Sequence, residues 1–137
     1  MTYNRSIFSK GTVTYTDLDI SFKAHPFTGD LIVKTDANAI KQALTNLLYT
    51  NFGERPFRPS IGAGLDNLLF EPLDELTHAE LQNAITLVIN NWEPRIAILD
   101  LVINEQPDDN SLAITLSFNI VNISQPQTIT VILKRVR

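Results

Sequence analysis

The amino-acid sequence predicts an α+β fold: two main helices packed on a C-terminal three-stranded antiparallel meander, with room for a short N-terminal strand. Apolar residues recur at helical spacing in two segments before residue 93, and they alternate with polar residues in segments after residue 95. Pro94 stands at the changeover, where its missing N–H and its effect on the preceding residue both act to end a helix. We therefore expect the last helix to end at about Trp92 and a strand to begin by about Arg95.

The composition limits the classes of function that fit. The 137 residues are 44% hydrophobic and 19% charged, which suits one globular domain with its own core. Residues 1–16 are polar and without period, so we expect a flexible N-terminal arm there and a single α+β domain over residues 17–137. The net charge of -4 argues against a broad grip on nucleic acid or an anionic membrane. There is no cysteine for disulfide or thiolate chemistry, and no apolar run reaches the roughly 18 residues of a membrane span.

Two short strand signals precede the first helix. Residues 17–22 alternate apolar with polar, and residues 31–34 form a short β-branched run. Between them, residues 25–30 combine proline, glycine and aspartate, which is typical of a turn. We expect an extended segment, a turn and a second short strand.

The first main helix is predicted from its caps and its apolar face. Asp36 or Asn38 supplies an N-cap, and Gly53 is placed to terminate the helix after it fades near Thr50. Residues at i, i+3, i+4, i+7 and i+8 are apolar, which gives one buried face. That face comprises Ile40, Ala43, Leu44, Leu47 and Leu48.

A long connection follows over residues 54–64. Its two prolines and two glycines exclude a regular element. Arg55, Phe57 and Arg58 are residue types suited to binding a partner. A connection of this length inside a compact domain is usually functional or disordered, and we favour a functional one. We expect four apolar residues to anchor it to the core, and residues 65–70 to form a short helix closed by Glu71-Pro72. The four anchors are Phe57, Ile61, Leu65 and Phe70.

The second main helix is predicted to open at a capping box, Thr77-x-x-Glu80. Its apolar residues again fall on one face, so the helix packs on the same core. That face comprises Leu81, Ala84, Ile85, Val88, Ile89 and Trp92.

The corner that ends this helix, Glu93-Pro94-Arg95, carries opposite charges on both sides of the proline. Residues two apart on an extended chain project to the same side, so Glu93 and Arg95 are expected to meet. Two interpretations stay open: an ion pair that only braces the corner, or an acid–base pair presented to a partner.

Three strands are predicted after the corner, over residues 96–104, 112–120 and 128–137. Turn residues at 107–110 and 124–127 separate them. A strand that ends the chain is often an edge strand, which can accept a chosen partner strand, and the basic end Lys134-Arg135-Val136-Arg137 resists casual aggregation.

Catalytic and metal-binding patterns are weak. Neither His25 nor His78 has a second ligand at a recognisable spacing, and no hydrolase, Walker or dinucleotide motif is present. Glu54, Glu71 and Glu93 could supply the two carboxylates of a glycoside hydrolase, although each stands next to a proline or arginine that explains it structurally. A small-ligand domain is a third option, for which the sequence offers no pocket.

An ordered set of motifs resembles a known family, the small baseplate wedge subunit or sheath initiator of contractile-tailed phages, which is shared with the type VI secretion baseplate. Single pieces are weak, but the set runs in order through roughly residues 17–100. The matching pieces are Asp17-Leu18-Asp19-Ile20-Ser21-Phe22, His25-Pro26-Phe27-Thr28-Gly29-Asp30, Asn38-Ala39-Ile40-Lys41-Gln42-Ala43-Leu44-x-Asn46-Leu47-Leu48, Gly53-Glu54-Arg55-Pro56-Phe57-Arg58-Pro59-x-Ile61-Gly62, Leu68-Leu69-Phe70-Glu71-Pro72 and Trp92-Glu93-Pro94-Arg95.

The resemblance implies a structural protein without a cofactor or metal, and not an enzyme. It implies binding to the core of the larger wedge subunits, with the family's Glu-Pro-Arg signature, here Glu93, Pro94 and Arg95, at that contact. It also implies a sheet edge that initiates tail sheath assembly, in a six-fold symmetric baseplate of the virion tail, assembled in the host cytoplasm. The alternative is a peptidoglycan-degrading tail lysozyme, a label that some family members carry. The expected partner-binding residues further include Arg55, Phe57 and Arg58, and the expected sheath-facing strand residues are Thr128, Thr130, Ile132 and Lys134.

Overall fold

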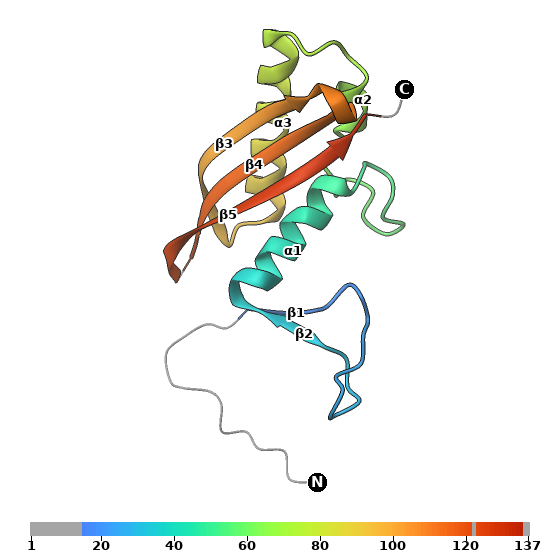
Figure 1. Ribbon diagram of the computed structural model, residues 1–137, viewed down its shortest axis with the longest axis vertical. Coiled ribbons are helices and arrows are strands. Elements are labelled where there is room, and N and C mark those ends of the chain that lie inside the picture. The colour runs from blue at the N-terminus through green and yellow to red at the C-terminus, as the bar shows by residue number, and fades with distance from the viewer. Residues whose placement is uncertain (1–14, 122, 136–137) are drawn as a thin grey trace. The chain divides into compact units, whose positions relative to one another are not determined.

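The computed structural model describes residues 15–121 and 123–135. The chain divides into two compact units, Met1–Ala39 and Ile40–Arg137. The N-terminal arm expected over residues 1–16 lies outside the described residues, apart from Tyr15 and Thr16. The fold is α+β, as predicted, with the main sheet at the C-terminal end of the chain (Figure 1).

The first unit contains a two-stranded antiparallel sheet. Strands β1 (Thr16–Leu18) and β2 (Val33–Thr35) pair along their whole length. Between them, the Gly29 N–H donates to the His25 carbonyl at 2.9 Å, and Gly29 has a φ of +74°. A positive φ is readily adopted by glycine, so the predicted turn at residues 25–30 forms where the glycine allows it. Both predicted strands form, but each is three residues long and includes one residue outside the predicted range, Thr16 in β1 and Thr35 in β2.

Helix α1 (Asp36–Tyr49) has the predicted apolar face. Four of its five predicted residues are buried, and Ala43 is half-buried. The helix ends at Tyr49, so the prediction that Gly53 terminates it is wrong. Gly53, with a φ of +84°, instead donates its N–H to the Pro59 carbonyl at 2.8 Å. The buried face residues are Ile40, Leu44, Leu47 and Leu48.

Two further helices follow, α2 (Asp66–Leu69) and α3 (Glu75–Trp92). The predicted capping box at Thr77 is wrong, because Asp74 caps α3 and accepts the Thr77 N–H at 2.8 Å. Asp74 is extended and carries a carboxylate, so it offers the helix an N-terminal acceptor before Thr77 is reached. The buried face of α3 comprises Thr77, Leu81, Ile85, Val88 and Ile89, whereas Trp92 is exposed.

The main sheet contains β3 (Ile96–Gln106), β4 (Ser111–Ile120) and β5 (Ile123–Lys134), in that order and antiparallel throughout. A 3-10 turn, η1 (Pro107–Asp109), joins β3 to β4 and is followed by left-handed Asn110, which confirms the first predicted turn.

The second predicted turn, at residues 124–127, is wrong because those residues belong to β5. The chain turns at Val121 instead. Pro126 fits inside β5 because β5 is an edge strand and its pairing with β4 is irregular between Phe118 and Ile120. A proline read as a turn signal is here an edge-strand residue.

The core of the second unit lies between the sheet and the helices, with α3 behind the sheet in Figure 1. Alternate β4 residues turn one face to that core, and five of them are at most 2% exposed. No helix among the described residues is long and apolar enough to cross a membrane. The five buried β4 residues are Leu112, Ile114, Leu116, Phe118 and Ile120.

Candidate docking surfaces

The corner Glu93-Pro94-Arg95 forms where α3 gives way to β3. The Glu93 N–H still bonds to the Ile89 carbonyl at 2.8 Å, and Glu93 then leaves helical geometry with φ -129° and ψ 70°. Arg95 donates from Nε to Glu93 Oε1 at 2.5 Å and from Nη2 to Oε2 at 2.7 Å. The expected meeting of the two side chains is therefore confirmed, in bidentate form.

The burial of this ion pair is one-sided. The Glu93 side chain is 7% exposed, whereas that of Arg95 is 34% exposed. The Arg95 carbonyl also accepts the Val121 N–H at 2.8 Å, which ties the corner to the end of β4. A buried carboxylate needs its partner, so the pair braces the corner, while the guanidinium keeps a solvent-facing side.

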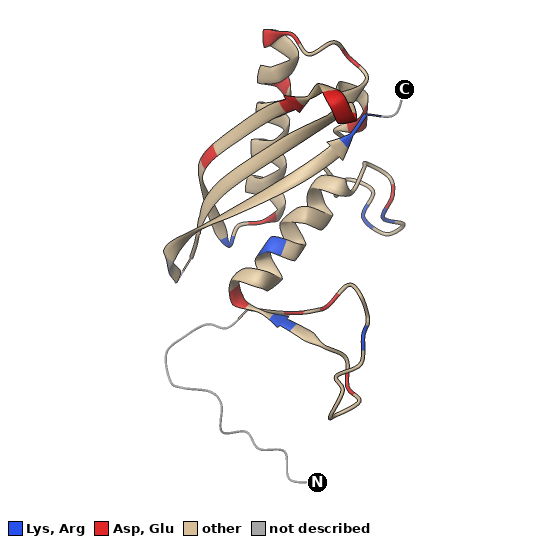
Figure 2. Ribbon diagram, in the orientation of Figure 1, with Lys and Arg blue, Asp and Glu red and all other residues tan. Residues whose placement is uncertain are grey.

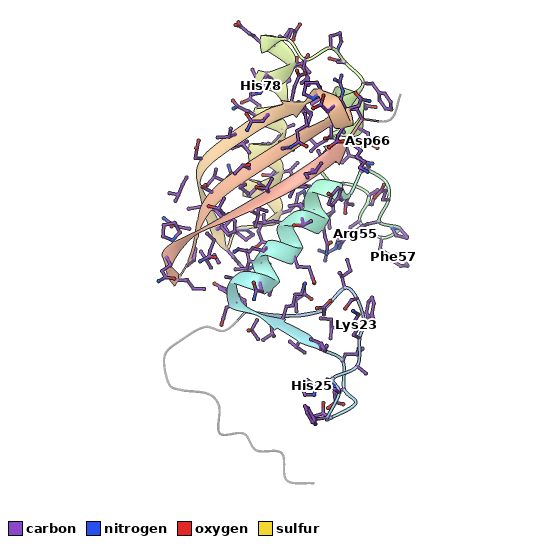
Figure 3. All side chains as sticks on the ribbon, in the orientation of Figure 1. Lys23, His25, Arg55, Phe57, Asp66 and His78 are labelled. Carbon is purple, nitrogen blue, oxygen red and sulfur yellow. The ribbon has the colours of Figure 1, made fainter. Side chains whose placement is uncertain are left out.

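The arginine loop, residues 54–64, presents its polar tip to solvent. Arg55, Phe57 and Arg58 are all exposed, Phe57 by 98%. Figure 3 shows Arg55 and Phe57 on this loop, with Phe57 at its outer end. The predicted anchoring by Phe57 and Phe70 is wrong, since Phe70 is 64% exposed as well.

The base of the arginine loop is held tightly. Ile61 and Leu65 are buried, as predicted, and the Ala63 N–H donates to the Thr50 carbonyl at 2.9 Å. Gly62 has a φ of +143°, and a Cβ there would lie 2.6 Å from the Thr50 carbonyl oxygen. Only glycine fits this approach, so the tip is carried on a fixed base.

The corner and the arginine loop lie at opposite ends of β5. The corner contacts Val121, which lies two positions before Ile123, the first residue of β5. The arginine loop follows α1, whose last residue, Tyr49, bonds to Ile132 near the end of β5. The six residues expected to bind a partner therefore form two separate surfaces (Figure 1).

Two carbonyls on the outer edge of β3 are capped by side chains of α3. Gln82 Nε2 donates to the Leu101 carbonyl at 3.4 Å, and His78 Nε2 lies 3.0 Å from the Ile103 carbonyl oxygen. A carbonyl can only accept, so His78 must donate from this nitrogen. The sequence contains no local signal for these contacts, which join residues far apart in the chain.

The outer edge of β5 is open over most of its length. Within a strand, alternate residues turn their N–H and C=O to opposite sides. The Arg135 N–H bonds inward to the Asn110 carbonyl at 2.9 Å, and the Ile132 carbonyl bonds outward to the Tyr49 hydroxyl at 2.8 Å. The backbone N–H and C=O groups that point away from β4 are therefore those of the even-numbered residues Thr128, Thr130, Ile132 and Lys134.

Among residues 15–121 and 123–135, the Tyr49 contact is the one hydrogen bond made to the outward backbone N–H and C=O groups of these four residues. The four side chains are also exposed, on the face of the sheet turned away from the core. Figure 2 shows no charged residue on β4 or in the middle of β5. Two hydroxyl pairs, Thr115–Thr130 and Ser117–Thr128, each 3.3 Å apart, join β4 to β5 on this face. The middle of β5 is thus an uncharged, regular strand edge.

Arg135 has a different role from the one expected. It donates from Nε to the Leu69 carbonyl at 2.7 Å and from Nη2 to the Glu71 carbonyl at 2.5 Å. Its charge is used inside the molecule to fix the end of β5 to α2, and is not displayed along the edge. Val136 and Arg137 lie outside the described residues.

The three candidate carboxylates are placed on different elements. Glu54 and Glu71 are exposed in loops, and both oxygens of Glu93 are held by Arg95. In the described part of the chain, no cluster of three or more His, Cys, Asp or Glu residues has the geometry to hold a metal ion. His25 lies in the turn of the first unit, where its Nδ1 accepts backbone N–H groups of Phe27 and Thr28.

Known proteins share both the sequence and the fold. The family model described as "Baseplate wedge protein gp25" matches residues 34–124. The baseplate wedge protein gp25 of Enterobacteria phage T4 is 30% identical over 108 residues, which cover 79% of this chain and 81% of that protein. A chain of the six-fold symmetrised baseplate of the anti-feeding prophage is 26% identical with a TM-score of 0.71, covering 82% of this chain and 90% of that one.

A crystal structure from Geobacter sulfurreducens that carries a tail lysozyme label is also similar. Its TM-score is 0.67 at 21% identity, over 72% of this chain and 89% of that one. At this identity the likeness is one of fold, and chemistry does not follow from fold.

Proposed function

This chain belongs to the family of the baseplate wedge protein gp25, and from that membership we propose that it connects two parts of a contractile-tail baseplate. One side binds the core of the larger wedge subunits, and the other offers a sheet edge on which the tail sheath begins. The protein then acts as a structural component of the virion tail, assembled in the host cytoplasm into a six-fold symmetric baseplate. The open edge of β5 is the observation that carries the proposal.

The two charged surfaces suit the wedge contact. Arg95 is fixed by Glu93 and keeps a solvent-facing side, so it is preorganised to meet a carboxylate or carbonyl oxygens of a partner. The arginine loop adds Phe57, an exposed aromatic anchor, between Arg55 and Arg58. Aromatic and arginine side chains dominate the binding energy of many interfaces.

The β5 edge suits the sheath contact. An added strand bonds to backbone groups, and Thr128 and Thr130 turn theirs outward. The middle of β5 has none of the charges that block edge pairing, while β3 has two of its edge carbonyls, those of Leu101 and Ile103, capped. A strand added to this sheet therefore belongs on β5.

The wedge contact is tested by co-purification with the large wedge subunit of the same tail. Phe57→Ala should weaken the complex about tenfold or more, the usual loss at a central aromatic anchor. Phe70→Ala is the matched control, because Phe70 is also exposed but lies outside the arginine loop. If both variants lose binding equally, or if neither loses it, the assignment of the arginine loop to the wedge contact would be contradicted.

The sheath contact is tested by two substitutions at one position. Thr130→Pro removes an outward N–H, which an edge strand tolerates, and should abolish binding of the sheath subunit. Thr130→Val keeps that N–H, loses only the hydroxyl, and should bind like the wild type. Circular dichroism checks that both variants are folded. A folded Thr130→Pro protein that binds normally would exclude edge pairing at this residue.

A peptidoglycan-degrading function has weaker support. It would need two working carboxylates across a cleft, yet Glu93 is engaged by Arg95, and Glu54 and Glu71 lie in exposed loops. The relative from phage T4 is named as a baseplate wedge protein. We expect no clearing of purified cell walls by this protein at mildly acidic or neutral pH. Clearing that disappears in Glu93→Gln would favour the enzyme.

A further inference from the structure

Tyr49 reaches the edge that β5 offers. It is the last residue of α1, and its hydroxyl donates to the Ile132 carbonyl at 2.8 Å across 83 positions of the chain. The side chain is 52% exposed, so the contact lies at the surface. Ile132 is one of the outward-pointing residues of β5, and its carbonyl is one that an added strand needs as an acceptor.

The contact defines how much of the edge is free. Toward the start of β5, Pro126 has no N–H to offer an added strand. Toward its end, the Ile132 carbonyl is occupied by Tyr49. Thr128 and Thr130 lie between these limits, and their outward N–H and C=O groups have no partner among the described residues.

Open space lies beside Tyr49. A hollow of about 360 Å³ adjoins the end of the β5 edge, with both Tyr49 and Ile132 in its wall. The Tyr49 side chain therefore borders open space on one side while it bonds to Ile132. The remaining wall residues are Asp66, Leu69, Leu133 and Lys134.

We propose that Tyr49 is a latch on the β5 edge: a strand of the sheath subunit pairs first with Thr128 and Thr130, and then displaces the Tyr49 hydroxyl from Ile132 to extend its pairing toward Lys134. This inference rests on the proposed function, because it assigns a step to the same sheath contact. The latch opposes pairing at the end of β5 and so restricts the edge to a strand long enough to compete for Ile132.

The test compares Tyr49→Phe with the wild type for binding to the sheath subunit of the same tail. The substitution keeps the ring and removes the one hydroxyl that holds Ile132. Because the neutral hydrogen bond from Tyr49 no longer competes for the Ile132 carbonyl, binding of the sheath subunit should tighten by about 2- to 10-fold. Tyr15→Phe is the control, since it makes the same chemical change in the first unit, and it should bind like the wild type.

Hydrogen exchange in the complex gives a second reading. In Tyr49→Phe, protection of backbone amides should extend more strongly to Ile132 and Lys134, while Thr128 and Thr130 are protected in both proteins. Equal or weaker binding by a folded Tyr49→Phe protein would overturn the latch and leave the sheath contact standing. Binding by neither protein would overturn both the latch and the proposed sheath function.

Discussion

Arg95 holds both carboxylate oxygens of Glu93, at 2.5 and 2.7 Å, from the other side of a proline. Pro94 ends the helix, and the turn that follows, with the Ile96 N–H 3.5 Å from the Glu93 carbonyl oxygen, brings the two side chains together. The geometry is compatible with both interpretations of the corner. The buried Glu93 carboxylate fits an ion pair that braces the fold, and the partly exposed Arg95 guanidinium fits a pair presented to a partner. The role in binding stays a proposal.

Removing Arg95 should destabilise the protein. Arg95→Ala leaves the Glu93 carboxylate buried without its partner, which typically costs about 3–5 kcal/mol. Urea unfolding followed by circular dichroism measures the free energy of unfolding. The double variant Glu93→Gln with Arg95→Ala should recover part of the loss, because no unpaired charge remains. A double variant that is no more stable than Arg95→Ala would mean that the buried charge is not the cause.

Gly62, in the arginine loop, and Gly53, just before it, should differ sharply on substitution by alanine. Gly62→Ala would place a Cβ 2.6 Å from the Thr50 carbonyl oxygen and 2.8 Å from the Asn51 backbone, so we expect a loss of roughly 2–5 kcal/mol. Gly53→Ala meets no atom within 4 Å, although its φ is +84°, and should lose only about 1–2 kcal/mol. Thermal unfolding of both variants measures the difference. Equal losses would refute the role of close approach at Gly62.

The end of β5 should depend on Arg135 more than on its neighbour. Arg135→Ala removes two charged hydrogen bonds to the carbonyls of Leu69 and Glu71, for an expected loss of about 1–3 kcal/mol. Lys134→Ala, on the exposed face, should change stability by about 0.5 kcal/mol or less. Chemical denaturation compares the two proteins. A larger effect at Lys134 would show that surface charge matters more than the clamp on α2.

The N-cap of α3 should make stability depend on pH in the acidic range. The backbone N–H of Thr77, and then its hydroxyl, hold the pKa of Asp74 below its ordinary value of 3.8. A lowered pKa in the folded state means that this contribution is present above pH 3.8 and is lost as the pH falls through the folded value.

Thermal unfolding from neutral pH down to about pH 2 should therefore show a shallower decline for Asp74→Asn, which keeps an acceptor but does not titrate. The pKa of Asp19 is also lowered, by the backbone N–H of Ser21. Because Asp19 is present in both proteins, its contribution to the pH dependence of stability is the same in each and does not affect the comparison. Parallel curves for the two proteins would contradict a stabilising charge at Asp74.

The helices and strands could be predicted from local sequence patterns, whereas the turn and cap that were predicted wrongly depend on competing residues and on the position of a strand in the sheet. Pro94, the helical apolar faces and the β4 alternation are local signals, and each predicted its element. The misplaced turn shows the limit of such signals, since Pro126 fits a strand only because that strand is at the edge of the sheet. The Thr77 cap fails because Asp74 competes for the same N–H group.

The contacts of the candidate surfaces also divide into those that local sequence predicts and those that it does not. The meeting of Glu93 with Arg95 was predicted from their spacing around the proline, although Pro94 and Arg95 lie in a turn and not on an extended chain. The Tyr49–Ile132 contact and the capping of β3 by His78 depend on pairings across the fold, for which the sequence has no local sign. The exposure of Phe57 was likewise invisible, because an aromatic residue in a loop can equally anchor it or mark a contact.

His78 and Gln82 occupy the outward carbonyls of Ile103 and Leu101, so the two edges of the sheet are not equivalent. A sheet with two free edges can stack copies without limit and grow into a fibre. Here an incoming strand meets two occupied acceptors on β3, so addition at that edge is disfavoured relative to addition at β5. For the proposed sheath contact, this asymmetry gives the sheet one preferred direction in which a strand can be added.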